Sequence, residues 1–123
     1  MTKKELLGKE LSNLYAIAKQ VNTYFDGSDI SFLNEKVKTI LSSYAKFSCA
    51  SEEQTSQMLR KMEVNPGNTS DSIVNEITEN LHDIVKSDHS PTIKNLGYSL
   101  SLNRLVAYHR ANIENVEYLM ANS

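Results

Sequence analysis

Apolar side chains recur at alternating steps of four and three residues through most of this 123-residue chain. In the first segment, residues 2–25, they are Leu7, Leu11, Leu14, Ala18, Val21 and Phe25. Spacing near 3.5 residues per turn places such residues on one stripe of an α-helix and is typical of helices that pack in bundles. The chain has only two prolines and four glycines, so little interrupts such helices. We find no stretch with the alternation of a strand, and the sequence therefore predicts an all-α protein.

Three further segments show the same kind of stripe. In residues 32–62 it is formed by Leu33, Val37, Ile40, Tyr44, Phe47, Met58 and Met62. In residues 71–86 it is formed by Ile73, Ile77, Leu81, Ile84 and Val85. In residues 91–121 it is formed by Tyr98, Leu102, Leu105, His109, Ile113, Val116 and Met120, and broadened by Ile93, Leu96, Leu100 and Ala107. We expect one domain, residues 1–123, built as an up-and-down bundle of three long helices and one short helix.

Polar residues at the segment boundaries predict where each helix begins. Side chains of Ser, Thr and Asp accept hydrogen bonds from the free N–H groups of a first turn. The candidate N-caps are Thr2 for the first helix, Ser28, Asp29 or Ser31 for the second, Thr69 or Ser70 for the third and Ser90 for the fourth. Pro91 directly after Ser90 is the favoured pairing at a helix start.

Charge and composition exclude several classes of partner. The formal net charge is −2, so sequence-independent binding to the phosphates of a nucleic acid is not expected. No apolar run approaches the ~18 residues that span a bilayer, and residues 1–11 show no signal-peptide core. Cys49 is the one cysteine and has no internal partner for a disulfide. We expect a cytoplasmic protein that binds neither nucleic acid nor membrane.

Part of the sequence resembles a known family. The string Leu14-Tyr15-Ala16-Ile17-Ala18-Lys19-Gln20 is similar to the L-Y-D-A-E-K-Q in the opening helix of the ferritin-like YciE/YciF family of bacterial proteins. The resemblance continues without a gap for about fifty residues, to Gln57-Met58-Leu59-Arg60-Lys61-Met62. It resumes at Leu105-Val106-Ala107-Tyr108, which is similar to the I-A-A-Y of the family's E-H-Y-E-I-A-A-Y stretch. The resemblance implies a ferritin-like bundle and a link to stress responses.

The metal ligands that the resemblance implies are replaced in this chain. A di-metal centre in a bundle needs inward carboxylates and histidines. The family's first-helix Glu corresponds to Ala18. Its H-L-x-E-T corresponds to Tyr44-Ala45-Lys46-Phe47-Ser48, and its E-H-Y-E to Ser101-Leu102-Asn103-Arg104. The resemblance thus implies the fold without its metal chemistry, with Ala18, Phe47 and Ser101 at the lost carboxylate positions.

Glu79 and His82 match the E-x-x-H metal-ligand motif, whose spacing brings two side chains to one face of a helix. The core face of that segment is set by Ile77, Leu81 and Ile84. At 100° per residue, Glu79 lies about 200° and His82 about 140° around the helix from Ile77. We therefore expect both side chains to face solvent rather than to hold a metal ion.

The other histidines and the cysteine also have structural interpretations. His89 lies in the loop before Pro91, where a capping loop is expected. His109 lies on the apolar stripe of the last segment and is expected to be buried, or at the core's edge, with one hydrogen bond. Cys49 has no neighbouring base in the sequence, so we expect a small buried residue rather than a nucleophile. We expect no catalytic residue, no cofactor and no bound metal.

These expectations favour a non-catalytic bundle that acts by association. The family has one more long helix after the I-A-A-Y stretch, so the resemblance implies that one side of the core is left uncovered here. We expect a homodimer, or a complex with another protein, in which Tyr15, Tyr108 and Tyr118 contribute. Two alternatives stay open: a ferritin-like di-metal protein with ligands placed elsewhere, and a histidine phosphotransfer module using His82 with Lys86.

Overall fold

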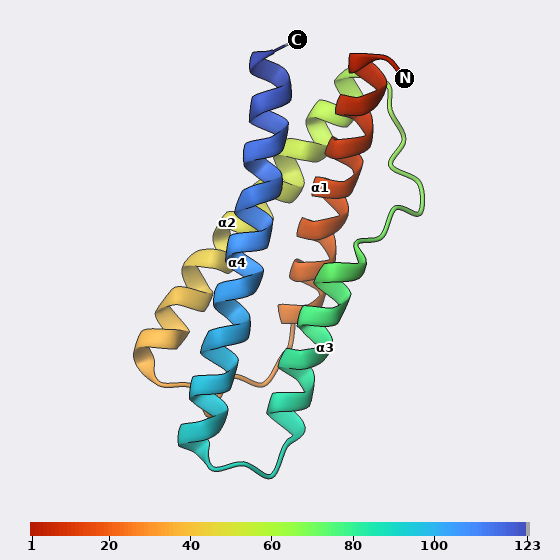
Figure 1. The fold of residues 1–123 in the computed structure, drawn as a ribbon. Helices are drawn as coiled ribbons and strands as arrows, with labels where there is room; N and C mark the ends of the chain where they lie inside the picture. Colours follow the sequence, from red (N-terminus) through yellow and green to blue (C-terminus); the bar gives the residue numbers. More distant parts are fainter. Residues whose placement is uncertain (123) are drawn as a thin grey trace.

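The computed structural model describes residues 1–122, which form four α-helices and no strand. The helices are α1 (Lys3–Phe25), α2 (Glu35–Lys61), α3 (Ser72–Lys86) and α4 (Pro91–Ala121). In Figure 1 the chain descends along α1, returns along α2, crosses a long loop, descends along α3 and ascends along α4. The prediction of an all-α protein is confirmed.

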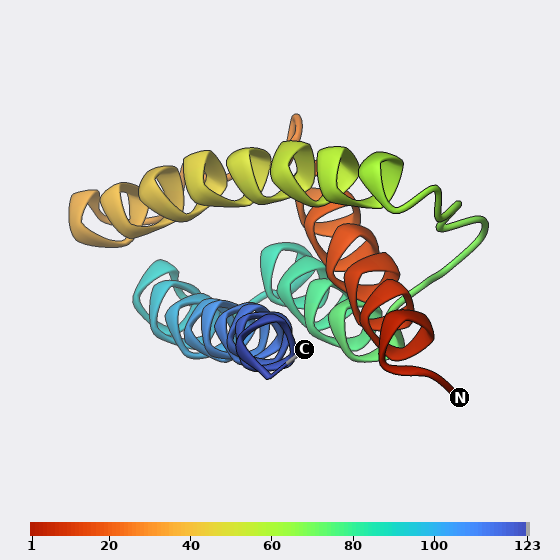
Figure 2. The same cartoon turned by 90° about the horizontal axis from the view of Figure 1, so that it is seen from above.

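Helices α1 and α4 each contact all of the other helices, and the most extensive packing is that of α1 against α2. The shorter α3 packs against α1 and α4, whereas α2 packs broadly on α1 and only narrowly on α4. Seen from above, α2 is inclined across one side of the other helices (Figure 2). This inclination leaves α2 and α4 in contact along only part of their length.

The core has two parts. The larger one joins all four helices through residues that include Ile17, Val21, Leu41, Leu81, Tyr98, Leu102 and Leu105. The smaller one joins α1, α2 and α4 beyond the end of α3, through Leu11, Leu14, Leu59 and Val116. Full burial of one such aliphatic side chain stabilises the fold by about 1.5–3 kcal/mol, so these clusters account for the packing of α1 against its neighbours.

Several residues that were expected in the core lie on the surface, and the prediction is wrong for them. They are Ile40 and Phe47 on α2, Ile73 on α3, and Ile93, Leu96, Leu100, Ala107 and Met120 on α4. The buried stripe of α2 consists of Val37, Leu41, Tyr44, Ser48, Ser51, Thr55 and Leu59. Its middle is polar, but Thr55 Oγ1 donates to the Ser51 carbonyl at 2.7 Å, so its hydroxyl is satisfied within the helix. Polarity therefore does not mark this face as solvent-exposed.

Two helix starts agree with the prediction. Thr2 caps α1 by accepting a hydrogen bond from the Glu5 N–H at 3.1 Å. Ser90 caps α4 by accepting from the Ile93 N–H at 3.3 Å, with Pro91 in the first turn. The expected N-caps of the first and last helices are therefore confirmed.

The other two starts differ. Helix α2 begins three residues later than expected and is capped by Asn34, not by the predicted Ser28, Asp29 or Ser31. The Asp29 carboxylate instead accepts hydrogen bonds from Ser31 inside the loop, which lowers the pKa of Asp29. Helix α3 is capped by Asp71, not by the predicted Thr69 or Ser70.

Candidate functional site

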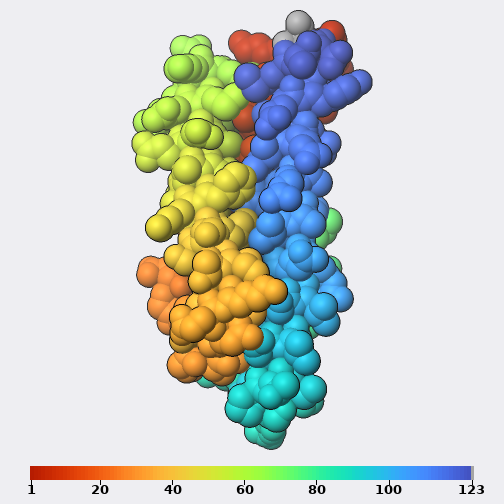
Figure 3. Space-filling model, turned by 90° about the vertical axis from the view of Figure 1, so that its left-hand side faces the viewer, coloured from red at the N-terminus to blue at the C-terminus, as the bar shows by residue number. Residues whose placement is uncertain are grey.

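A groove runs between α2 and α4 on the face shown in Figure 3, where the two helices lie side by side. It consists of two adjoining hollows of about 400 Å³ each, with Phe47 as a shared wall. The lower hollow is lined by Thr39, Ile40, Ser43, Tyr44, Val106 and Arg110. The upper hollow is lined chiefly by Ala50, Gln54, Met58, Ile113, Glu117 and Met120. We call these two hollows together the α2/α4 groove.

The α2/α4 groove exposes large apolar side chains. Phe47 is 47% exposed, Ile40 45% and Met120 47%. Arg110 and Glu117 are the only charged residues among those that line the two hollows. Large apolar side chains that gather around hollows in this way are a feature of interaction sites.

A buried histidine lies directly behind Phe47. His109 has no exposed surface; its Nδ1 lies 2.8 Å from Tyr44 Oη and its Nε2 lies 3.4 Å from Ser51 Oγ. Burial lowers the pKa of His109 to about 4 and raises the pKa of Tyr44. The imidazole is therefore neutral near pH 7, with one ring nitrogen donating and the other accepting. The expected burial of His109 is confirmed, with two hydrogen-bond partners instead of one.

The three positions that the resemblance assigned to lost carboxylates have separate roles. Ala18 is fully buried in the core, and Ser101 is buried and donates to Asn80 Oδ1. Phe47 points outward into the α2/α4 groove. Within residues 1–122, no three or more His, Cys, Asp or Glu side chains form a group that could hold a metal ion.

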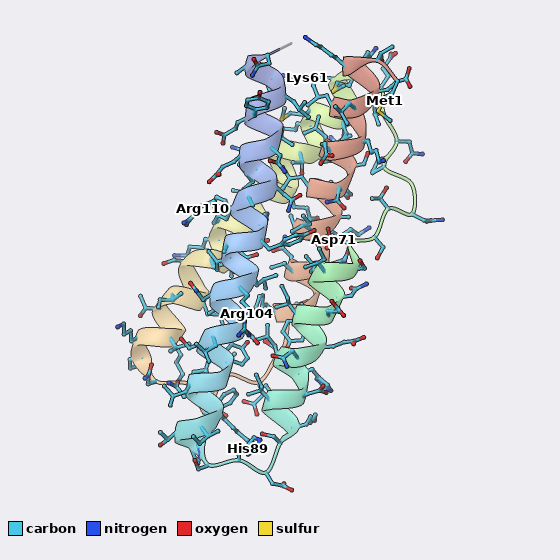
Figure 4. The ribbon with its side chains drawn as sticks, in the orientation of Figure 1. Met1, Lys61, Asp71, His89, Arg104 and Arg110 are labelled. Atoms are coloured by element: carbon cyan, nitrogen blue, oxygen red, sulfur yellow. The ribbon has the colours of Figure 1, made fainter. Side chains whose placement is uncertain are left out.

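Glu79 and His82 are both exposed on α3, as expected. His82 lines a hollow that also contains Asp26, Asp29 and Lys86. His89 is exposed in the loop between α3 and α4, at the lower end of the molecule in Figure 4. Neither histidine lies behind the α2/α4 groove, so the structure does not bring the histidines together.

The expectation for Cys49 is wrong, because its side chain is exposed. The buried stripe of α2 passes through Ser48 and Ser51, and one residue of helix turns the next side chain by 100°. Cys49 therefore faces a second hollow, between α1 and α2, which Tyr15, Glu52 and Arg60 also line.

Two of the three tyrosines expected in a dimer contact already have side-chain contacts within the chain. Tyr108 donates to Asp71 Oδ2 at 2.6 Å, and burial together with this hydrogen bond raises the pKa of Tyr108 to about 12. Tyr15 is half-buried, and the Lys19 ammonium lies 5.9 Å from its ring centre. Tyr118 is 70% exposed.

Sequence reasoning missed the α2/α4 groove, although a stripe at Val106, Arg110, Ile113, Glu117 and Met120 marks it in the sequence.

Comparison with protein-family models, with curated proteins and with solved structures gives no match to this chain. Among residues 1–122, no helix has both the length and the apolar character needed to cross a membrane.

Proposed function

We propose that this chain is a ferritin-like bundle without a metal centre, which acts by associating with protein, in the first place with a second copy of itself. The observation that carries the proposal is the α2/α4 groove, where Phe47 and Ile40 remain about half exposed beside hollows of about 400 Å³. Exposing such side chains to water is unfavourable, and covering them with a partner removes that cost.

The replaced ligand positions support the absence of metal chemistry. Ala18 is packed where a ferritin-like protein would place a carboxylate, and the Ser101 hydroxyl is engaged by Asn80. The alternating helix directions in Figure 1 and the partial resemblance together support the ferritin-like arrangement. The position of Phe47 supports a change of role, from ligand position to contact surface.

The placement of the histidines supports a non-catalytic role. His109 is sealed beneath Phe47 and Tyr44, so a substrate does not reach its ring. His82 shares its hollow with Asp26, Asp29 and Lys86, so two carboxylates lie near the one ammonium group that could attract a phosphoryl donor. Neither arrangement favours general-base catalysis or phosphotransfer.

Metal content tests the proposal. The untagged full-length chain is incubated in turn with ferrous iron, manganese and zinc, freed of excess ions and subjected to elemental analysis. We expect far less than one ion per chain for each metal, since no described group of side chains supplies the donors. About two ions per chain, the number of a di-metal centre, would contradict the proposal and favour a di-metal bundle.

A further inference from the structure

The groove-facing residues of α4 carry apolar and charged side chains in an order that is the same in both directions, apart from the sign of charge. They are Val106, Arg110, Ile113, Glu117 and Met120, which line the two hollows together with the buried Val116. The steps between them are four, three, four and three, so they form one stripe with the 3.5-residue period of packed helices. The order is apolar, positive, apolar, negative, apolar.

The two charges on this stripe are not neutralised within the chain. Neither Arg110 nor Glu117 forms an ion pair with any residue in 1–122. They are seven residues apart on one helix, about 10.5 Å along its axis, which is too far for them to pair with each other. Figure 4 shows Arg110 extending from α4 on the side where α2 lies. Each charge therefore remains available to a partner.

We propose that a second copy of the chain docks in the α2/α4 groove, with its α4 antiparallel to the first α4 about a two-fold axis beside Ile113. Ile113 lies three residues after Arg110 and four residues before Glu117, so an axis just beyond Ile113 brings each Arg110 opposite the Glu117 of the other copy. A two-fold contact forms both ion pairs at once, because the same patch is used on both copies. The proposal rests on the association proposed above and names its surface.

The apolar members of the stripe fit the same axis. Val106 lies four residues before Arg110, and Met120 lies three residues after Glu117. Antiparallel packing therefore places Val106 of one copy within one residue of the level of Met120 of the other, and the two Ile113 residues lie on either side of the axis. A parallel packing in register would instead place like charges opposite each other, which is unfavourable.

Helix α2 supplies an aromatic anchor for the second copy. The Phe47 ring centre lies 5.5 Å from that of His109 and 6.4 Å from that of Tyr44, so buried rings support it from behind. The small residues Ser43 and Ala50 lie one turn on either side of Phe47 along the groove. A supported aromatic ring between small neighbours is the kind of residue on which binding energy concentrates.

Charge reversal tests the pairing. Arg110→Glu and Glu117→Arg each place two like-charge contacts in the dimer, and we expect each to raise its dissociation constant about tenfold or more. The double variant R110E/E117R restores both pairs with reversed polarity and should return the dissociation constant to within a few-fold of the original. Glu76→Arg changes the net charge as Glu117→Arg does, but Glu76 is exposed on α3 and lines neither hollow, so it should leave the dissociation constant nearly unchanged.

Failure of this rescue, or an equal effect of Glu76→Arg, would overturn the proposed geometry. Far-UV circular dichroism of each variant checks that the helices are intact. If the wild type associates but charge reversal has no effect, the surface is wrong while the proposed association stands. If the wild type does not self-associate, the two-fold contact is excluded outright.

Cross-linking tests the position of the axis independently. In a Cys49→Ser background, Ile113→Cys places two thiols near the axis, where oxidation should join the copies, since disulfides need Cα atoms about 4.4–6.8 Å apart. Leu100→Cys in the same background is the control, because Leu100 is 60% exposed but does not line the groove. A covalent dimer with Ile113→Cys and not with Leu100→Cys supports the proposal, and the reverse result overturns it.

Discussion

At the scale of single residues, the centre of the bundle contains paired and unpaired hydroxyl groups close together on α2. Ser51 Oγ is within 3.4 Å of His109 Nε2, whereas Ser48 Oγ is fully buried with no hydrogen-bond partner in residues 1–122. The Ser48 carbonyl does have a partner, since it accepts from Asn22 Nδ2 at 3.3 Å. The two serines are three residues apart on the same helix and differ mainly in this pairing.

Replacing each serine with alanine should change stability in opposite directions. Ser48→Ala removes an unsatisfied buried hydroxyl and places a better helix former in α2, so we expect a gain of about 1 kcal/mol in the free energy of unfolding. Ser51→Ala removes a partner of His109 and should cost about 1 kcal/mol. Urea unfolding of both variants measures the difference. Shifts of the same sign and size would show that the two hydroxyl environments are equivalent.

The buried His109 predicts a dependence of stability on pH. Its folded-state pKa of about 4 lies below the ordinary value of 6.5, because burial disfavours the charged ring. The unfolded chain therefore takes up this proton first, and stability is intact above about pH 6.5 and lost as the pH falls toward 4. Between about pH 7 and about pH 4.5, the wild type should lose on the order of 2 kcal/mol more than His109→Gln.

Urea unfolding at the two pH values measures this loss. The exposed His82 and His89 are present in both proteins, so the comparison isolates the contribution of His109. Equal losses for the wild type and for His109→Gln would mean that another group causes the acid sensitivity.

At the scale of helices, Asp71 joins α3 to α1 and α4. Its Oδ1 accepts from the Val74 N–H at 2.8 Å and caps α3, while its Oδ2 accepts from Tyr108 Oη at 2.6 Å. Its backbone N–H donates to Gln20 Oε1 at 2.8 Å, and its carbonyl accepts from Gln20 Nε2 at 3.0 Å. Figure 4 shows Asp71 where the long loop enters α3. One buried residue thus fixes the start of the short helix against two long ones.

Asp71→Ala should therefore destabilise the protein by more than the loss of a cap alone. A lost N-cap costs about 1 kcal/mol, and the unpaired Tyr108 hydroxyl adds about 1 kcal/mol or more. Ser70→Ala, at the adjacent exposed residue, is the control and should change the free energy of unfolding by less than about 0.5 kcal/mol. Thermal unfolding compares the two variants, and similar melting temperatures would mean that Asp71 does not fix α3.

The sequence predicts the helices well but not all of their faces. The breaks near residues 26–31, 65–68 and 87–90 separate four helices whose ends mostly agree with the structure. On α2 the sequence favours the more apolar stripe through Ile40 and Phe47, while the buried stripe contains Ser48, Ser51 and Thr55. Hydroxyl groups that bond within the helix can be buried at little cost, so hydrophobicity alone misplaces such a face. The Asp71 cap was missed because its bonds to Gln20 and Tyr108 depend on tertiary contacts.

At the scale of the whole molecule, the unequal packing of α2 explains the candidate site. Broad packing on α1 and narrow packing on α4 leaves the α2/α4 groove open on one face (Figure 3). The family resemblance implies that one side of the core needs a partner, with Tyr15, Tyr108 and Tyr118 expected in the contact. Tyr15 and Tyr108 have contacts within the chain, while Tyr118 is exposed. The groove depends on the inclination of α2, which the spacing of apolar residues in the sequence does not predict.

The solution mass of the untagged full-length chain tests the central claim most directly. Sedimentation equilibrium over a range of micromolar concentrations, at neutral pH, measures it without a surface or a label. One chain has a mass of 13.9 kDa, and we expect the average mass to rise with concentration toward twice that value. Phe47→Ser should shift this rise to higher concentration, because the aromatic anchor is lost. A mass of 13.9 kDa at every concentration, for a chain with a fully helical spectrum, would contradict self-association through the α2/α4 groove.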